Sequence, residues 1–215
     1  IIDDAGQMTA EAANSLLKLL EEPPPGWLFI LITQQAERLL PTVLSRVVRL
    51  RFDAPDSSAV QQILKAKGIT QNTQVLAALA GGSPGRALSY NQADIFAIRR
   101  EALDLLKKLP LQNPFVYIAA LGWGEKYDRA AALLLTEQFI YLLRDVLLLQ
   151  SGAGGQVYNT DIMAGLDGIA ADWPLHTARQ GVNAAQEAWQ NINKNVSAKN
   201  VLEALVLKLD LLRKE

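Results

Sequence analysis

The sequence predicts a mostly α-helical protein that begins with part of an α/β domain. Three observations lead to this fold class. Residues 1–52 hold apolar runs on either side of an amphipathic helix pattern, the order of a strand-helix-strand unit. Residues 54–92 hold short helix patterns divided by glycine and proline, and residues 93–215 show helical periodicity without a competing strand pattern. We therefore predict parallel strands with helices, then a small three-helix domain, then a larger all-α domain.

The composition is that of an ordinary globular protein, and it excludes several kinds of site. Of the 215 residues, 50% are hydrophobic and 20% are charged, which is enough apolar material for one large or several small domains. The formal net charge of −1 argues against a surface that binds DNA over its whole extent. With no cysteine and only His176, the chain lacks the residues for a disulfide framework, a thiolate zinc site or a histidine-based triad. The absence of cysteine fits a cytoplasmic location.

The first predicted strand ends on two carboxylates. The apolar pair Ile1-Ile2 is followed by Asp3 and Asp4, as expected at the carboxyl end of a parallel strand, where α/β sheets bind ligands. Two acids at this place could serve a Mg²⁺ ion and a water molecule. Since Ile1 lies inside the strand pattern, we expect further strands of the sheet to precede it.

A helix and a second strand follow. Thr9 is expected to cap the helix, and the prolines after Glu22 end it. Leu28–Thr33 is a continuous apolar strand with a polar residue at its carboxyl end. Val47–Phe52 alternates apolar and basic side chains, which predicts a third strand with one exposed face.

Breaks in the hydrophobic pattern define the domains. The predicted boundaries give residues 1–53 for the α/β part, residues 54–92 for the small helical domain and residues 93–215 for the all-helical domain. Helices of the small domain are expected from Ser57 or Ser58 to about Lys67, from Asn72 to Ala80, and from Pro84 onward.

The helices of the largest domain are marked by caps and apolar faces. We expect them at residues 93–108, 114–121, 128–150, 161–171, 177–193 and 197–213. The most apolar stretch, residues 130–149, contains Glu137 and Arg144, and a charge at a bilayer centre costs about 2.5–3.5 kcal/mol. We therefore interpret it as a buried helix rather than a membrane span. The paired bases Arg99-Arg100 are interpreted as a solvated helix face.

Several short motifs in the first ninety or so residues follow one another in an order that is specific as a set. They are Ile2-Asp3-Asp4-Ala5, Met8-Thr9, Ala12-Ala13-Asn14-Ser15-Leu16-Leu17-Lys18, Leu20-Glu21-Glu22-Pro23 and Leu39-Leu40-Pro41-Thr42-Val43-Leu44-Ser45-Arg46. With these motifs the chain resembles the AAA+ clamp-loader subunits of replicative DNA polymerases. The resemblance implies a partial AAA+ α/β domain, a three-helix lid and an all-helical collar domain that joins subunits into a ring.

The resemblance also implies roles for individual residues. Asp3 and Asp4 fall at the Walker B position, with Asp3 as the Mg²⁺ ligand and Asp4 toward the attacking water. Thr33 falls at the sensor-1 position and Arg86 at the sensor-2 position, both as ATP contacts. Arg46 corresponds to the arginine finger that reaches a neighbouring subunit's ATP site. The alternative for Asp3 and Asp4 is a solvated strand end, and the alternative for Thr33 is an ordinary threonine at the end of a strand. Arg86 could instead pair with an acidic neighbour, and Arg46 could be a surface arginine.

The implied function is ATP-dependent loading of the sliding clamp during DNA replication. Expected partners are other clamp-loader subunits, contacted through the collar and the Arg46 face, with the sliding clamp and primer-template DNA reached through the assembled complex; no membrane partner is expected. ATP and Mg²⁺ are expected cofactors of the intact complex. Residues 1–215 alone are expected to bind no cofactor and to have no activity, because the Gly-rich phosphate loop would precede Ile1.

Two alternatives stay open. The first is an ATP-hydrolysing motor subunit of the clamp loader, which an upstream Gly-x-x-x-x-Gly-Lys-Ser/Thr motif would support. The second is another AAA+ protein that remodels a different partner through a helical oligomerisation domain.

Overall fold

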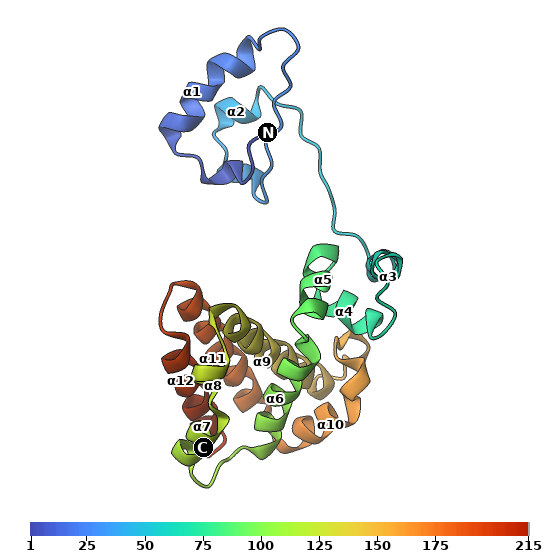
Figure 1. The fold of residues 1–215 in the computed structure, drawn as a ribbon, viewed down its shortest axis with the longest axis vertical. Helices are drawn as coiled ribbons and strands as arrows, with labels where there is room; N and C mark the ends of the chain where they lie inside the picture. Colours follow the sequence, from blue (N-terminus) through green and yellow to red (C-terminus); the bar gives the residue numbers. More distant parts are fainter. Residues whose placement is uncertain (215) are drawn as a thin grey trace. The chain divides into compact units, whose positions relative to one another are not determined.

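The computed structural model describes residues 1–214, and the chain divides into two compact units (Figure 1). These units are Ile1–Asp53 and Ala54–Glu215. The three-domain division, with its further boundary after residue 92, stays a prediction. The chain is mostly helical, as the sequence predicts.

The first unit consists of two helices joined by extended segments. These are α1 (Ala10–Glu21) and the short α2 (Pro41–Leu44), with 3₁₀ turns at Ala5–Gln7 and Ala36–Arg38. Thr9 caps α1 as predicted, because its side-chain oxygen accepts the N–H of Ala12 at 3.3 Å. The side chains of Ala13, Leu16, Leu39 and Val43 form the small buried interior of this unit.

The predicted strands of the first unit meet only at one point. Ile2 and Leu31 form an isolated parallel bridge, in which Ile2 N donates to Ile30 O at 2.8 Å and Ile32 N donates to Ile2 O at 2.9 Å. No continuous strand forms over residues 28–33. The parallel direction agrees with the prediction, but a partial α/β domain with a parallel sheet is not confirmed.

The third predicted strand is absent from the described part of the chain. Residues 47–52 carry no secondary structure, and Val48, Leu50 and Phe52 are 88%, 76% and 90% exposed. An alternating pattern favours an extended backbone, but a strand also needs a neighbour that exchanges N–H and C=O bonds with it. Residues 1–214 supply no such neighbour to this segment.

The second unit begins with three short helices. They are α3 (Ser57–Ala66), α4 (Thr73–Leu79) and α5 (Pro84–Gln92), each within two residues of its predicted start. Asp56 caps α3 instead of a serine, since its carboxylate accepts the N–H of Ala59 at 2.8 Å. Their buried side chains form one cluster, which also packs against Leu134, Tyr141 and Tyr158. The short helices therefore have a core of their own that packs against the part of the chain that follows.

The remaining helices pack around a long central one. They are α6 (Ile95–Lys108), α7 (Pro114–Leu121), α8 (Trp123–Lys126), α9 (Arg129–Gln150), α10 (Met163–Asp172), α11 (Leu175–Asn193) and α12 (Ala198–Leu212). Helix α9 contacts α6, α10, α11 and α12 (Figure 1). Its side chains at Leu135, Phe139, Leu142 and Val146 are fully buried, as three-to-four spacing requires of a helix enclosed by others. Within residues 1–214, none of the helices is long and apolar enough to cross a membrane.

The interpretation of Arg99 as a solvated residue is wrong. Its side chain is only 6% exposed, and it donates to Asn159 at 2.9 Å and to the carboxylate of Asp161 at 2.9 and 2.5 Å. A buried guanidinium requires such partners to offset its lost hydration. Both partners lie about sixty residues away in the chain, where no local pattern connects them to Arg99.

Candidate functional site

A polar pocket of about 140 Å³ lies in the first unit. Its lining consists of Asp4, Gly6, Gln7, Thr33, Gln34, Gln35 and Arg38. The parallel bridge positions these residues, because it brings the chain after Ile2 beside the chain after Leu31. A further bond from Ala5 N to Ile32 O, at 2.8 Å, fixes the turn that carries Asp4. Two predicted site residues, Asp4 and Thr33, are thereby brought to one pocket.

The two adjacent carboxylates adopt different positions. Asp4 has a left-handed backbone with φ 51°, a conformation that aspartate tolerates better than most residues. The carboxylate of Asp3 accepts the N–H of Asp4 at 2.9 Å, which supports this turn. Asp4 lines the pocket and Asp3 does not.

Thr33 lies beside Gly6 at the pocket wall. The Thr33 hydroxyl oxygen accepts the Gln35 N–H and donates to the Gln35 carbonyl, both at 3.2 Å. A Cβ placed on Gly6 would lie 2.8 Å from this oxygen, closer than real Cβ contacts allow. Glycine at this position therefore permits the close approach of the Ala5–Gln7 turn to Thr33.

The pocket contains groups that suit a Mg²⁺ ion and a phosphate. Carboxylate and hydroxyl oxygens, here from Asp4 and Thr33, are the ligands that Mg²⁺ prefers, and the guanidinium of Arg38 suits a phosphate oxygen. Within residues 1–214, no group of three His, Cys, Asp or Glu side chains gathers as an all-protein metal site. Mg²⁺ usually keeps several waters and takes few carboxylates, so the donor set fits a nucleotide-bound ion. The ATP and Mg²⁺ contacts of Asp3, Asp4 and Thr33 stay predictions.

Arg46 lies elsewhere in the first unit, directly after α2. Its Nε donates to Glu21 Oε1 at 2.8 Å, and its Nη1 donates to the Thr42 carbonyl at 2.9 Å and to Ser45 Oγ at 3.1 Å. The Arg46 side chain is 35% exposed. The guanidinium is thus held in a defined place at the surface of the unit.

Arg86 belongs to the second unit, where Ser83 accepts its N–H at the start of α5. Its guanidinium forms an ion pair with Glu137 of α9 and donates to Tyr141 at 2.8 Å and Tyr90 at 2.6 Å. The Tyr90 hydroxyl in turn donates to Glu137 at 2.5 Å. Arg86 therefore has the acidic neighbour that the alternative interpretation describes, and its sensor-2 role stays a prediction.

The electrostatics of this cluster favour a charged arginine and neutral tyrosines. Burial opposes the charge of Arg86, but the carboxylate of Glu137, with contributions from Tyr141 and Tyr90, holds the Arg86 pKa above its ordinary value. Burial, followed by the hydrogen bond to Glu137, raises the pKa of the Tyr90 phenol. Burial and the charge of Glu137 raise the pKa of Tyr141 in the same way.

Sequence reasoning missed two residues of the first unit, one that lines the same pocket as predicted site residues and one that binds a predicted site residue. Arg38 lines the pocket with Asp4 and Thr33, and Glu21 binds Arg46. Arg38 ends a short 3₁₀ turn, and Glu21 ends α1. A charged residue at the end of a local element gives no signal of what lies near it in the fold, so neither placement could be predicted from spacing.

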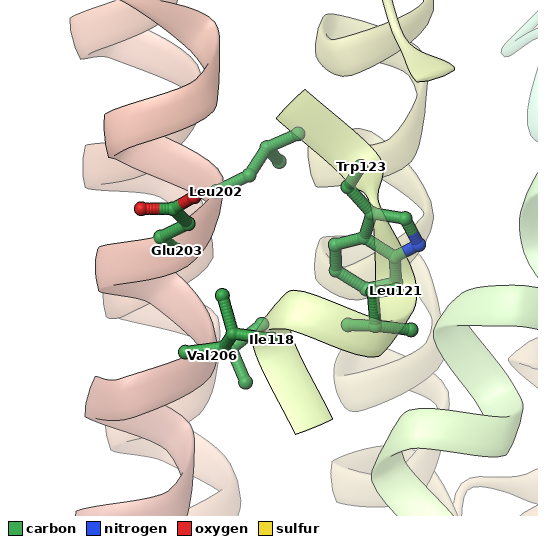
Figure 2. A pocket seen from close by; sticks show the side chains of 6 residues that line it. All are labelled: Ile118, Leu121, Trp123, Leu202, Glu203 and Val206. Atoms are coloured by element: carbon green, nitrogen blue, oxygen red, sulfur yellow. The ribbon is translucent and has the colours of Figure 1, made fainter. Parts of the chain in front are cut away.

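A much smaller hollow, of about 10 Å³, lies in the second unit. Figure 2 shows its lining of Ile118, Leu121, Trp123, Leu202, Glu203 and Val206, from α7, α8 and α12. This volume holds about one water molecule. It is a packing gap between helices and does not bring together any of the predicted site residues.

Comparison with known proteins places these observations in a family context. A family model described as DNA polymerase III, delta subunit, matches residues 1–56. The chain is 29% identical to DNA polymerase III subunit delta' of Bacillus subtilis over 97% of its own length and 64% of the relative. It is 34% identical to the subunit delta' of Escherichia coli over 85% of its length and 52% of that relative.

A second kind of relative matches a shorter part. DNA polymerase III subunit gamma/tau of Mycobacterium tuberculosis is 33% identical over 49% of the chain and 21% of the relative. The chain thus spans between about half and two thirds of the first two delta' relatives. The motifs of the first unit are most like those of bacterial delta' subunits, and relatives matching most of the chain confirm that this protein resembles DNA polymerase III subunit delta'.

Proposed function

We propose that this chain acts as a delta'-like subunit of the bacterial DNA polymerase III clamp loader and contributes to ATP-dependent loading of the sliding clamp. The observation that carries this proposal is the similarity to subunit delta' over 97% of the chain. Its partners would be the other clamp-loader subunits, and through the assembled complex the sliding clamp and primer-template DNA. The parallel bridge between Ile2 and Leu31 supports an AAA+ α/β arrangement for the first unit.

In this proposal Arg46 serves a neighbouring subunit rather than its own. A planar guanidinium can bind two phosphate oxygens at once and stabilise the charge that spreads over a transferring phosphoryl group. The Arg46 side chain is partly exposed, and its Nη2 lies beside Glu21 at the surface of the unit. This placement supports a residue that acts across an interface.

The helices of the second unit would supply the oligomer contacts of the collar. Helix α7 is apolar around its whole circumference, with Phe115 and Val116 70% and 65% exposed. An apolar helix in a soluble protein is normally enclosed on all sides. The exposed side of α7 therefore supports a contact with another subunit.

A second candidate function is that of an ATP-hydrolysing motor subunit. The similarity to gamma/tau over 49% of the chain favours it, together with the gathering of Asp4 and Thr33 at one pocket. The two candidate functions depend on different residues. A motor subunit would lose its own turnover when Asp3 or Asp4 is replaced, whereas a finger-donating subunit would depend on Arg46 alone.

The test is Arg46→Ala in the complex reconstituted from this subunit and its partner subunits. Assembly and ATP binding by the neighbour should stay intact, because the guanidinium matters mostly when charge develops in the transition state. Turnover should fall. An arginine finger is worth about 10³–10⁵ in rate in GTPases, and the drop should be smaller here because other sites still fire. Arg46→Lys should rescue poorly, since lysine lacks the planar fork.

Arg49→Ala and Arg51→Ala are the matched controls. Arg51 pairs with Asp53 with both side chains highly exposed, and Arg49 is also exposed. Surface charges of this kind contribute little, so DNA-stimulated ATP hydrolysis should barely change. If all three alanine variants behave alike, or if Arg46→Ala loads clamps at the normal rate, the finger assignment is wrong.

A further inference from the structure

The Arg46 guanidinium is held from two directions. The Thr42 carbonyl and Ser45 Oγ accept hydrogen bonds from Nη1. Glu21 Oε1 accepts the Nε hydrogen bond at 2.8 Å and lies 2.5 Å from Nη2. Thr42 and Ser45 are local partners, four and one residues before Arg46, whereas Glu21 lies 25 residues earlier on another helix.

These two sets of contacts do different things. The bonds to Thr42 and Ser45 belong to the turn that ends α2 and would move with that turn. Glu21 is the last residue of α1, so its contact fixes the guanidinium relative to a second element. Since a guanidinium acts through a planar fork, its orientation decides whether two N–H groups can face the same phosphate.

The ion pair between Arg46 and Glu21 is strong enough to orient the guanidinium but too weak to hold it permanently. The side chains of Arg46 and Glu21 are 35% and 48% exposed, so both are well hydrated. Exposed ion pairs of this kind contribute little to stability. A pair this weak limits the free rotation of a long side chain, yet it gives way at little cost when a phosphate oxygen becomes available.

We propose that Glu21 is a positioning residue that orients Arg46 for the transferring phosphoryl group of a neighbouring subunit. The inference rests on the function proposed for Arg46. In the absence of Glu21 the guanidinium would keep its charge and its local bonds but sample more orientations, and fewer of them would be productive. Glu21 itself touches no substrate.

The test uses Glu21→Ala and Glu21→Gln in the reconstituted complex, with Glu22→Ala as the matched control. Glu22 is the adjacent exposed carboxylate that ends α1 as its C-cap. Glu21→Ala should lower kcat for ATP about two- to fivefold, which is the rate equivalent of about 0.4–1 kcal/mol, without a change in KM. Glu21→Gln should recover part of the loss, because its amide oxygen can still accept the Nε hydrogen bond. Glu22→Ala should leave kcat unchanged.

Two further measurements test whether Glu21 acts through Arg46. In an Arg46→Ala background the Glu21→Ala substitution should have no additional effect, since a positioning residue acts only through its target. In the isolated chain, the Arg46 Nε–H signal in NMR should exchange with solvent faster in Glu21→Ala than in Glu22→Ala.

The outcomes separate this inference from the proposed function. If Arg46→Ala has no effect on turnover, the finger proposal fails, and this inference fails with it. If Arg46→Ala lowers kcat but Glu21→Ala leaves it unchanged or raises it, the finger stands and the positioning role of Glu21 is wrong. A kcat loss in Glu21→Ala that persists in the Arg46→Ala background also overturns the positioning role.

Discussion

Gly6 shows how a single missing Cβ shapes the candidate pocket. A Cβ at this position would meet the Thr33 hydroxyl at 2.8 Å, and the hydroxyl cannot turn away without losing its bonds to Gln35. We expect Gly6→Ala to weaken the local structure by about 1–2 kcal/mol. Amide hydrogen exchange at Ala5 and Ile32, whose N–H groups bond across the bridge, should accelerate accordingly.

A rescue distinguishes this clash from a general effect of alanine. In the double variant Gly6→Ala with Thr33→Ala the hydroxyl is gone, so exchange should return to the level of Thr33→Ala alone. Gly85→Ala is the control, because its added Cβ would meet no atom within 4 Å. Additive effects of the two substitutions would show that the close approach to Thr33 is not the cause.

Glu101 offers a residue-level prediction about pH. Its carboxylate accepts the indole N–H of Trp123 at 2.9 Å and pairs with Lys126. Burial tends to raise the Glu101 pKa, but the hydrogen bonds from Lys126, Tyr127 and Trp123 and the charge of Lys126 hold it below the ordinary value. A lowered folded-state pKa stabilises the fold above the unfolded-state pKa of about 4.3, and this contribution is lost as the pH falls through the folded-state value.

Glu101→Gln should therefore be less stable than the parent by about 1 kcal/mol near pH 7, and the difference should shrink as the pH falls below about 4. Urea unfolding at several pH values measures it. Glu125→Gln, which changes an exposed carboxylate on α8, is the control and should leave the stability near pH 7 almost unchanged. A difference between Glu101→Gln and the parent that stays constant down to pH 3 would contradict the linkage.

At the scale of elements, the contribution of a charged contact to the free energy of unfolding depends on its burial. Glu137 of α9 is 15% exposed and binds Arg86 and Tyr90 of α5, whereas Glu187 pairs with Lys208 with side chains 61% and 53% exposed. Glu137→Gln should lower the free energy of unfolding by about 1.5–3 kcal/mol, the range of hydrogen bonds to charged groups. Glu187→Gln should cost less than about 1 kcal/mol. Chemical denaturation measures both values. If the two variants lose the same free energy of unfolding, the contact between α5 and α9 does not stabilise the packing of these helices.

At the scale of the whole chain, the second unit should unfold as one cooperative body. The core cluster of α3, α4 and α5 packs against Leu134 and Tyr141 of α9, and Glu137 binds Arg86. Residues 94–215 alone should still fold cooperatively, because their own core is large. They should be less stable than residues 54–215 by roughly 3 kcal/mol or more, since Leu134 and Tyr141 would lose the apolar cover of the α3–α5 helices.

Circular dichroism during thermal and urea unfolding tests this comparison. Glu137→Gln should lower the stability of residues 54–215 and have little effect in residues 94–215, where Arg86 and Tyr90 are absent. A weakly helical, non-cooperative trace for residues 94–215 would show that the α3–α5 helices are required for folding. Equal stability of the two pieces would show that the packing of the α3–α5 helices against α9 contributes nothing.

The helices could be predicted from sequence because their signals are local. Asn113 and Asp128 accept the N–H groups of Val116 and Ala131 at the starts of α7 and α9, within one residue of the predicted helix starts. Three-to-four spacing likewise identifies the buried face of α9. Because these features depend on only a few neighbouring residues, they can be predicted without knowledge of the fold.

Tertiary structure alone decided the strands and the charged contacts. The alternation of residues 47–52 did not produce a strand, because a strand depends on a partner elsewhere. Arg46, Arg86 and Arg99 find their carboxylates 25, 51 and 62 residues away. A sequence shows that such a residue carries charge, but which carboxylate reaches it depends on how the helices pack, and that packing joins side chains with no fixed spacing.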